Sequence, residues 1–302
     1  MTKRVNHFFV ARWLHWILVP CLLGGSGRLL ADKHKGAPEG VLGGIAVFSN
    51  GIYNLALNTA GGSVGRYTAG TGPSHPVTIL TGSSQNVIYN GSISFPGTTF
   101  NSIRSFTSGT TYTFGSVAGA VNMDTCSPLV IPGPLGATIT YFLATCGPLT
   151  DTLIVQFTAL LHGTTSTDST IEFTTVIINT GLTARSVGVR YMIDFQIGPD
   201  DGPTFQALNP NGVATFLEIG FVPPAFESYR MQNNQGSVVP LFNVLGTVTG
   251  PSSVSPTPTP PTELDYTRWP TAFSTAFDYT VVPGANADGD SAVITAVRLE
   301  VP

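Results

Sequence analysis

The sequence predicts an all-β protein, built as a large antiparallel β-sandwich. Segments rich in Thr, Val, Ile, Phe and Tyr recur along the chain, and 34 glycines and 23 prolines supply turns between them. Only 10% of the residues are charged, fewer than we expect in a helical enzyme, whereas 42% are apolar. That apolar content can bury a sizeable core, so the composition also argues against a disordered chain.

The strand predictions are clearest in the middle of the chain. Residues 171–179 and 186–195 flank a short loop through Gly181, and apolar side chains alternate with polar ones in the second segment, which predicts a hairpin with one packed face. Residues 152–161 are more continuously apolar and predict an inner strand that is covered on both faces. Earlier hairpin strands are expected at residues 51–57, 87–89, 100–106 and 110–114.

The N-terminal segment differs from the rest. Basic residues precede an apolar run at 13–23, and small residues follow it before Asp32. This order is typical of a secretory signal, and the run is shorter than the roughly 20 residues of a membrane-spanning helix. We therefore expect residues 1–31 to be a helical signal peptide and residues 32–302 to be a single β-sandwich domain, secreted or at the cell surface. An ordinary N-terminal helix or a retained anchor is the alternative.

Charge limits the partners of the exported chain. Residues 1–31 contain four of the 13 basic residues and no acidic one, which leaves nine basic against 17 acidic residues, a net charge of −8. No basic run remains, so we expect no nucleic-acid partner, and no membrane contact after cleavage of the signal.

Two cysteines, Cys126 and Cys146, lie outside the predicted signal. An even number in an exported chain indicates a disulfide, which would stabilise the fold by roughly 3 kcal/mol by closing a loop of about 20 residues. Two free buried thiols are the alternative. The proline-rich residues 250–262 favour an extended conformation, and too few residues follow for an independent domain, so we expect a surface loop there.

Several segments together resemble a group of uncharacterised bacterial secreted proteins related to the supersandwich of galactose-mutarotase-like folds. The matching segments are 97–106, 111–115, 175–181, 186–194, 197–205, 268–269, 277–280 and 290–293. The resemblance implies a supersandwich fold and an extracellular compartment, but no activity, because a fold alone does not supply one. The chain departs from the group in its proline-rich segment.

An acidic turn suggests a metal site. Asp194, Asp200 and Asp201 stand near Gly202, and carboxylates that converge in such a turn can hold Ca²⁺. A solvent-exposed β-turn is the alternative. Residues 286–290 also resemble part of a calcium loop, but Ser291 replaces the turn glycine, so we expect an Asp-Gly hairpin turn there.

Catalytic residues are not evident. The expected domain contains His34, His75 and His162, and no spacing pairs one of them with an acid. The acids considered are Glu172, Glu218 and Glu227. We therefore do not expect an enzyme, although mutarotase-type chemistry would use a Glu together with a His.

Aromatic residues are the remaining sign of a ligand site. Trp269, Phe277 and Tyr279 cluster after the proline-rich loop, and exposed rings bind sugars by stacking. Burial in the sandwich core is the alternative. The sequence thus predicts a non-catalytic structural or interaction module; the alternatives are a carbohydrate-binding or carbohydrate-processing protein and a self-assembling surface-layer or filament subunit. The expected partners are a glycan, another surface protein, or a second copy through sheet edges.

Overall fold

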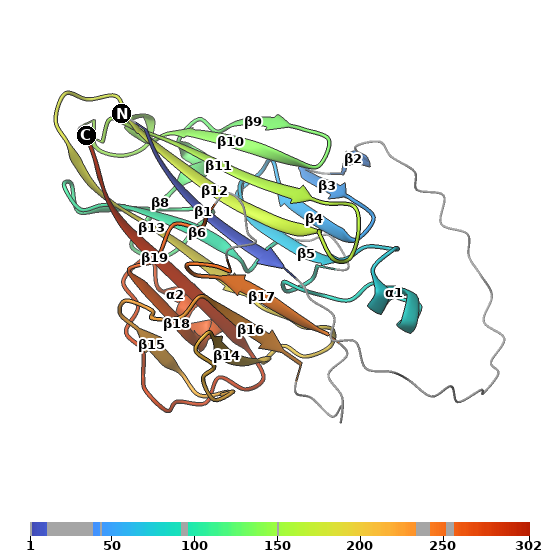
Figure 1. Cartoon of the computed structure of the whole chain (residues 1–302). Helices are drawn as coiled ribbons and strands as arrows, with labels where there is room; N and C mark the ends of the chain where they lie inside the picture. Colours follow the sequence, from blue (N-terminus) through green and yellow to red (C-terminus); the bar gives the residue numbers. More distant parts are fainter. Residues whose placement is uncertain are drawn as a thin grey trace, which may run out of the picture.

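The computed structural model describes residues 2–10, 39–42, 44–91, 96–149, 151–233, 242–251 and 257–302. It confirms a mostly β protein with two large sheets and a smaller one. The two large sheets form adjacent layers (Figure 1) and contact each other directly: the Thr175 and Tyr191 hydroxyls are 2.7 Å apart, and the Phe205 ring stacks on Tyr266.

The first large sheet has eight antiparallel strands. In spatial order they are β14 (Thr204–Leu208), β16 (Ser228–Gln232), β17 (Asn243–Thr247), β1 (Thr2–Val10), β12 (Thr170–Asn179), β11 (Leu153–His162), β10 (Gly136–Phe142) and β9 (Leu129–Pro132). β11 and β12 confirm the strands predicted at 152–161 and 171–179. Buried and half-buried residues alternate along β11, so only one of its faces is fully covered, and the expectation of two covered faces was wrong.

The second large sheet has seven strands. In order they are β15 (Ile219–Phe221), β18 (Glu263–Arg268), β19 (Ser291–Val301), β13 (Arg185–Asp194), β6 (Phe100–Ser105), β7 (Thr110–Thr113) and β8 (Val121–Asn122). All pairs are antiparallel except β7 with β8. The predicted hairpin of 171–179 with 186–195 was wrong, because β12 and β13 are consecutive strands that belong to different sheets.

Arg190 explains why the alternation along β13 was misleading. Its side chain was expected on a solvent face, but it is fully buried beneath α2 (Trp269–Ser274). The guanidinium donates hydrogen bonds to the carbonyl oxygens of Ala272, Thr275 and Ala276. Both faces of β13 are therefore covered, one by apolar side chains and the other by backbone acceptors.

The smaller sheet consists of β2 (Glu39–Leu42), β3 (Ile45–Ser49), β4 (Tyr53–Asn58) and β5 (Tyr67–Thr71). Tyr67 joins this sheet to the eight-stranded one, because its ring stacks on Phe157 and Phe173. The strands expected at 51–57, 100–106 and 110–114 are confirmed as β4, β6 and β7, whereas 87–89 forms only an isolated bridge between Ile88 and Phe195.

Helices are short in the part of the chain that the structure describes. Besides α2 there are α1 (Pro76–Thr81) and two 3-10 turns, η1 (Met123–Thr125) and η2 (Leu143–Thr145). In the described part of the chain, no helix combines the length and the apolar character needed to cross a membrane.

The predicted signal peptide and the proline-rich loop lie partly outside the described residues. The apolar run at 13–23 lies outside them, whereas Thr2–Val10, expected to be the basic part of an export signal, forms β1 between β12 and β17. The helix expected at the start of the chain is therefore wrong for residues 2–10, whereas export itself stays a prediction. The described parts of 250–262 connect β17 in one sheet to β18 in the other.

Candidate functional sites

An acidic cluster forms where β13 ends and β19 begins. Asp194 is the last residue of β13, and Asp290 directly precedes β19, whose Ala292 pairs with Asp194. Asp201 lies in the turn that follows β13. One carboxylate oxygen from each of the three aspartates lies within 4.8 Å of the other two. The cluster of Asp194, Asp201 and Asp290 is called the aspartate triad below.

Two backbone contacts hold the turn of Asp201 against the loop of Asp290. The Ser291 amide donates to the Asp201 carbonyl oxygen at 2.9 Å. Gly202 lies so near Gly289 that a β-carbon on Gly202 would be 2.0 Å from the Gly289 nitrogen. The absence of a side chain at Gly202 therefore allows the two acidic loops to meet.

Burial makes the negative charges of the triad costly. Asp194 is 1% exposed, and desolvation raises its pKa well above the ordinary value. Burial, followed by the charge of Asp290, raises the pKa of Asp201 to about 6. Burial also raises the pKa of Asp290 to about 6, although the charge of the exposed Arg268 opposes this. Nearby Tyr89 has a raised pKa, first from desolvation and then from all three carboxylates.

The triad contains two of the three predicted metal ligands. The structure brings Asp194 and Asp201 together, as the prediction requires. Asp200 is buried outside the triad, and its Oδ1 accepts from the Gly202 amide at 3.1 Å, so its observed role is to shape the turn. Asp290 was missed as a ligand because its segment had been interpreted as a turn; only the pairing of β13 with β19 reveals it.

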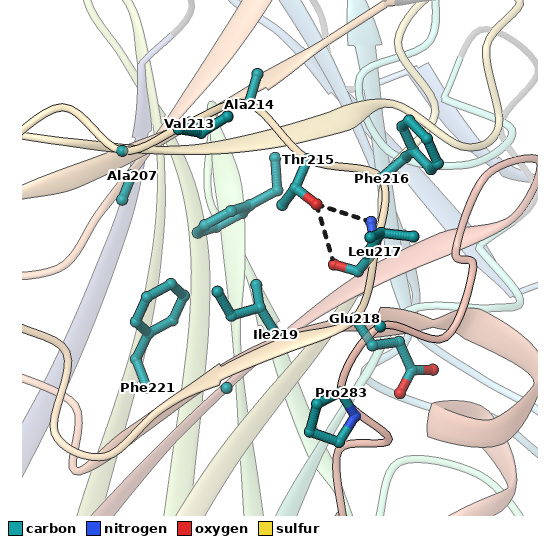
Figure 2. Close-up of a pocket in the computed structure, with 14 residues that line it drawn as sticks. Ala207, Val213, Ala214, Thr215, Phe216, Leu217, Glu218, Ile219, Phe221 and Pro283 are labelled. Carbon is teal, nitrogen blue, oxygen red and sulfur yellow. Dashed lines mark hydrogen bonds between the residues drawn. The ribbon is translucent and has the colours of Figure 1, made fainter.

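A large apolar pocket lies between β14 and β15, which are edge strands of the two large sheets (Figure 2). It has a volume of about 780 Å³. β14 and β15 form its walls, together with the loop that joins them and a second loop. The lining residues are Phe205, Ala207, residues 212–221, Pro283 and Gly284. Val213 is 90% exposed and Phe216 is 44% exposed, so the pocket rim presents apolar surface to solvent.

Glu218 is the carboxylate in the wall of this pocket, but it is already engaged. Its side chain is buried and accepts hydrogen bonds from the hydroxyls of Thr267 and Tyr279, each at 3.1 Å. The backbone amides of Arg268 and Val282 donate to it as well. Glu218 therefore holds two loops against β18, and the pocket offers an almost entirely apolar lining to a partner.

The aromatic residues expected to bind a sugar do not form an exposed platform. Phe277 and Tyr279 are buried, and the Phe277 ring packs edge-on against Phe106. Trp269 is half-buried; its indole nitrogen donates to the Thr98 carbonyl oxygen, and its ring contacts Phe273. These side chains pack α2 and the following loop onto the seven-stranded sheet.

One imidazole does meet an acid. His162 Nε2 lies 2.7 Å from Glu172 Oε2, an arrangement that sequence spacing did not reveal because the residues lie diagonally across β11 and β12. The direct contact leaves no room for a substrate between the two groups. His75 is buried, and burial lowers its pKa to about 4. His34 lies outside the described residues.

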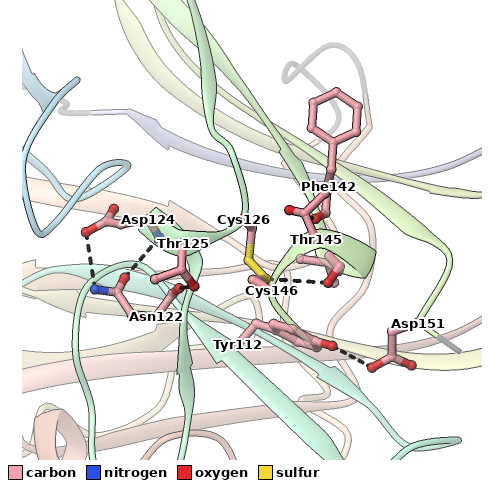
Figure 3. Close-up of a disulfide and its surroundings, with 10 residues drawn as sticks. Tyr112, Asn122, Asp124, Thr125, Cys126, Phe142, Thr145, Cys146 and Asp151 are labelled. Carbon is pink, nitrogen blue, oxygen red and sulfur yellow. Dashed lines mark hydrogen bonds between the residues drawn. A yellow bond between two sulfur atoms is a disulfide. The ribbon is translucent and has the colours of Figure 1, made fainter. Parts of the chain in front are cut away.

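The disulfide between Cys126 and Cys146 is confirmed (Figure 3). It joins the residues that directly follow η1 and η2. Nearby, the carboxylate of Asp151 accepts hydrogen bonds from the hydroxyls of Ser105, Ser108 and Tyr112. A disulfide indicates an oxidising compartment outside the cytoplasm.

Comparison of the chain with protein-family models and with curated proteins finds no match. The resemblance to supersandwich proteins therefore stays a prediction.

Proposed function

We propose that this protein is a secreted or cell-surface β-sandwich module of the supersandwich type, with a structural role exerted through contacts between copies and without a catalytic activity. The observation that carries this proposal is the apolar pocket between β14 and β15. The disulfide supports the extracytoplasmic location, because such bonds persist in oxidising compartments.

The pocket has the properties of an interaction surface. Large apolar side chains gather on its rim and beside it, although a protein normally keeps such surface small and scattered. They are Val213, Phe216, Leu217, Ile219, Val222 and Val282. The pocket also adjoins β15, the last strand of its sheet, and strands in that position readily pair with another chain.

A second copy of the chain carries a complementary surface. β9 ends the eight-stranded sheet on the side away from β14, and Leu129 and Ile131 on it are 52% and 56% exposed. Figure 1 shows β9 and β15 on opposite sides of the molecule. β9 of one copy docking at the pocket of the next is a head-to-tail contact, and repetition of such a contact builds a filament or a layer.

Carbohydrate binding or processing is the alternative raised by the sequence. The ring faces of Phe277 and Tyr279 are buried against the protein, so a sugar cannot stack on them without displacing core contacts. The pocket is lined by apolar side chains, which suit a protein segment more than a hydroxyl-rich ligand. These two observations favour self-association over glycan binding.

Complementation between two variants tests the proposal. Val213→Glu places a charge at the pocket, and Ile131→Lys places one on β9. In sedimentation velocity, we expect the wild type to associate as its concentration rises and each variant alone to remain monomeric. An equimolar mixture should form dimers, because it retains one intact pocket and one intact β9.

Leu182→Lys is the matched control, since Leu182 is fully exposed and lies in the loop between β12 and β13, away from both surfaces. This variant should associate like the wild type. A wild type that stays monomeric at every concentration, or a mixture of the two variants that forms no dimer, would overturn the proposal.

A further inference from the structure

We propose that Asp194, Asp201 and Asp290 bind one divalent cation, and that Ca²⁺ is the ion that suits them. This site is separate from the assembly surface of the proposed function, and each proposal can fail without the other.

The separation of the three carboxylates fits a single ion. Ca²⁺ binds oxygen at about 2.3–2.6 Å, so two oxygens on opposite sides of the ion are about 4.6–5.2 Å apart. The triad places one oxygen of each aspartate within 4.8 Å of the others. Side-chain adjustments alone can therefore bring all three oxygens onto one ion, without a rearrangement of β13 or β19.

Asp194 provides an independent sign that a ligand is required. Its side chain is 1% exposed, and its Oδ1 atom has no hydrogen-bond partner. A hydrogen bond from Thr98 reaches the Asp194 carboxylate, but it leaves Oδ1 unsatisfied. A buried carboxylate oxygen without a partner is costly and uncommon in native proteins. A cation in the triad would offset the cost of burying this carboxylate.

The charges around the triad also favour a cation. The negative charges of Asp201 and Asp290 act on Asp194, and those of Asp290 and Asp200 act on Asp201. The Tyr89 phenol feels the charges of the same cluster, and the exposed Arg268 acts on Asp290. Like charges held together in a partly buried site repel one another, and a divalent ion offsets two of them.

The backbone carbonyl groups of the triad are already engaged, so the remaining ligands of the ion would be water. The carbonyl oxygens of Asp194, Asp201 and Asp290 already accept hydrogen bonds from Tyr89, Ser291 and Trp269, respectively. Ca²⁺ takes about six to eight oxygen ligands, so water would complete its shell. A site with three carboxylates and several waters belongs to the weaker class, with Kd near 10⁻⁴ to 10⁻³ M as in extracellular modules.

Calorimetric titration of the full chain with CaCl₂, after treatment with a chelator, tests the site. We expect one Ca²⁺ per chain, a Kd of about 10⁻⁴ to 10⁻³ M, and a rise in Tm at saturating Ca²⁺. Asp201→Asn and Asp290→Asn should each weaken binding by about tenfold or more, since each removes a charged ligand. Asp194→Asn should do the same. The first two residues are only half-buried, so their variants keep the test decisive if Asp194→Asn does not fold.

Asp288→Asn is the matched control, because Asp288 is exposed in the same loop as Asp290 and lies outside the triad. It should bind Ca²⁺ with the affinity of the wild type. No binding heat and no Tm shift in the wild type would overturn the site, as would an equal loss of binding in Asp288→Asn and Asp201→Asn. Equal affinity for Mg²⁺, which prefers shorter bonds, would overturn the assignment to Ca²⁺.

Discussion

Gly202 and Gly289 lie in direct backbone contact, although they are far apart in the sequence. A β-carbon on Gly202 would be 2.0 Å from the nitrogen of Gly289 and 2.8 Å from the Asp288 carbonyl carbon. This contact sets the turn of Asp201 against the loop of Asp290. The distance between two proposed calcium ligands therefore depends on a residue that has no side chain.

Gly202→Ala should weaken Ca²⁺ binding while all three carboxylates remain. The added methyl group forces the two loops apart, and overpacking of this kind typically destabilises a protein by about 1–3 kcal/mol. Titration with CaCl₂ and urea denaturation measure both effects. Gly62→Ala is the control, because a β-carbon there has no atom within 4 Å. Unchanged calcium affinity in Gly202→Ala would contradict the role assigned to this contact.

Tyr112→Phe should destabilise the fold by about 1–3 kcal/mol, since it removes a hydrogen bond to a buried carboxylate. The Tyr112 hydroxyl donates to Asp151 Oδ2 at 2.6 Å and so ties β7 to the segment before β11 (Figure 3). Ser108→Ala removes a partly buried donor to the same oxygen, which water can replace, so its effect should be smaller. Urea denaturation that ranks the two variants in the opposite order would count against this explanation.

His75 should make stability depend on pH. Its pKa is about 4 in the folded protein, below the ordinary 6.5, because burial disfavours the charged ring. The unfolded chain therefore takes up the proton first, and stability is lost as the pH falls from 6.5 towards 4, by up to about 3 kcal/mol. His75 Nδ1 also accepts from the Val77 amide, which requires an unprotonated nitrogen.

His75→Asn provides the comparison, since Asn keeps an acceptor for the Val77 amide at the start of α1 and does not titrate. Urea denaturation of both proteins at pH 7 and pH 4.5 gives the difference between them. The wild type should lose more stability than the variant over this interval. Equal losses in the two proteins would show that His75 does not carry the effect.

Loss of the disulfide should destabilise the protein by about 3 kcal/mol, because the bond closes a loop of 20 residues in the unfolded chain. The double variant Cys126→Ala/Cys146→Ala avoids placing a hydroxyl at the buried Cys126 position. Its urea denaturation should not respond to reductant, whereas reductant should lower the midpoint of the wild type. A variant as stable as the wild type would contradict a stabilising role for the bond.

Local alternation identified most of the central strands, but it did not identify their neighbours. β12 and β13 follow each other in the sequence and were predicted to pair, yet they lie in different sheets. Arg190 on β13 shows a related limit, because its polar side chain is buried and its guanidinium donates to carbonyl oxygens more than 80 residues away. A period-of-two pattern shows which side chains share a face, but it does not show what covers that face.

The candidate sites were only partly predicted, because the sequence does not show which distant segments meet. Asp194 and Asp201 are near each other in the sequence and meet in the structure, whereas Asp290 joins them only through the pairing of β13 with β19. Phe277 and Tyr279 are close in the sequence as well, but the loop that carries them packs inward. Sequence proximity predicted that residues would meet, and it did not predict whether solvent would reach them.

Hydrogen–deuterium exchange at low and high protein concentration is the most direct test of assembly through the two apolar surfaces. Amides of 129–131 and 213–221 should exchange more slowly at high concentration, because each surface is covered by the neighbouring copy. Amides of α1, which carries the exposed Ile79 and Leu80 but belongs to neither surface, should exchange at one rate throughout. Identical exchange of 129–131 and 213–221 at both concentrations would contradict the proposed role.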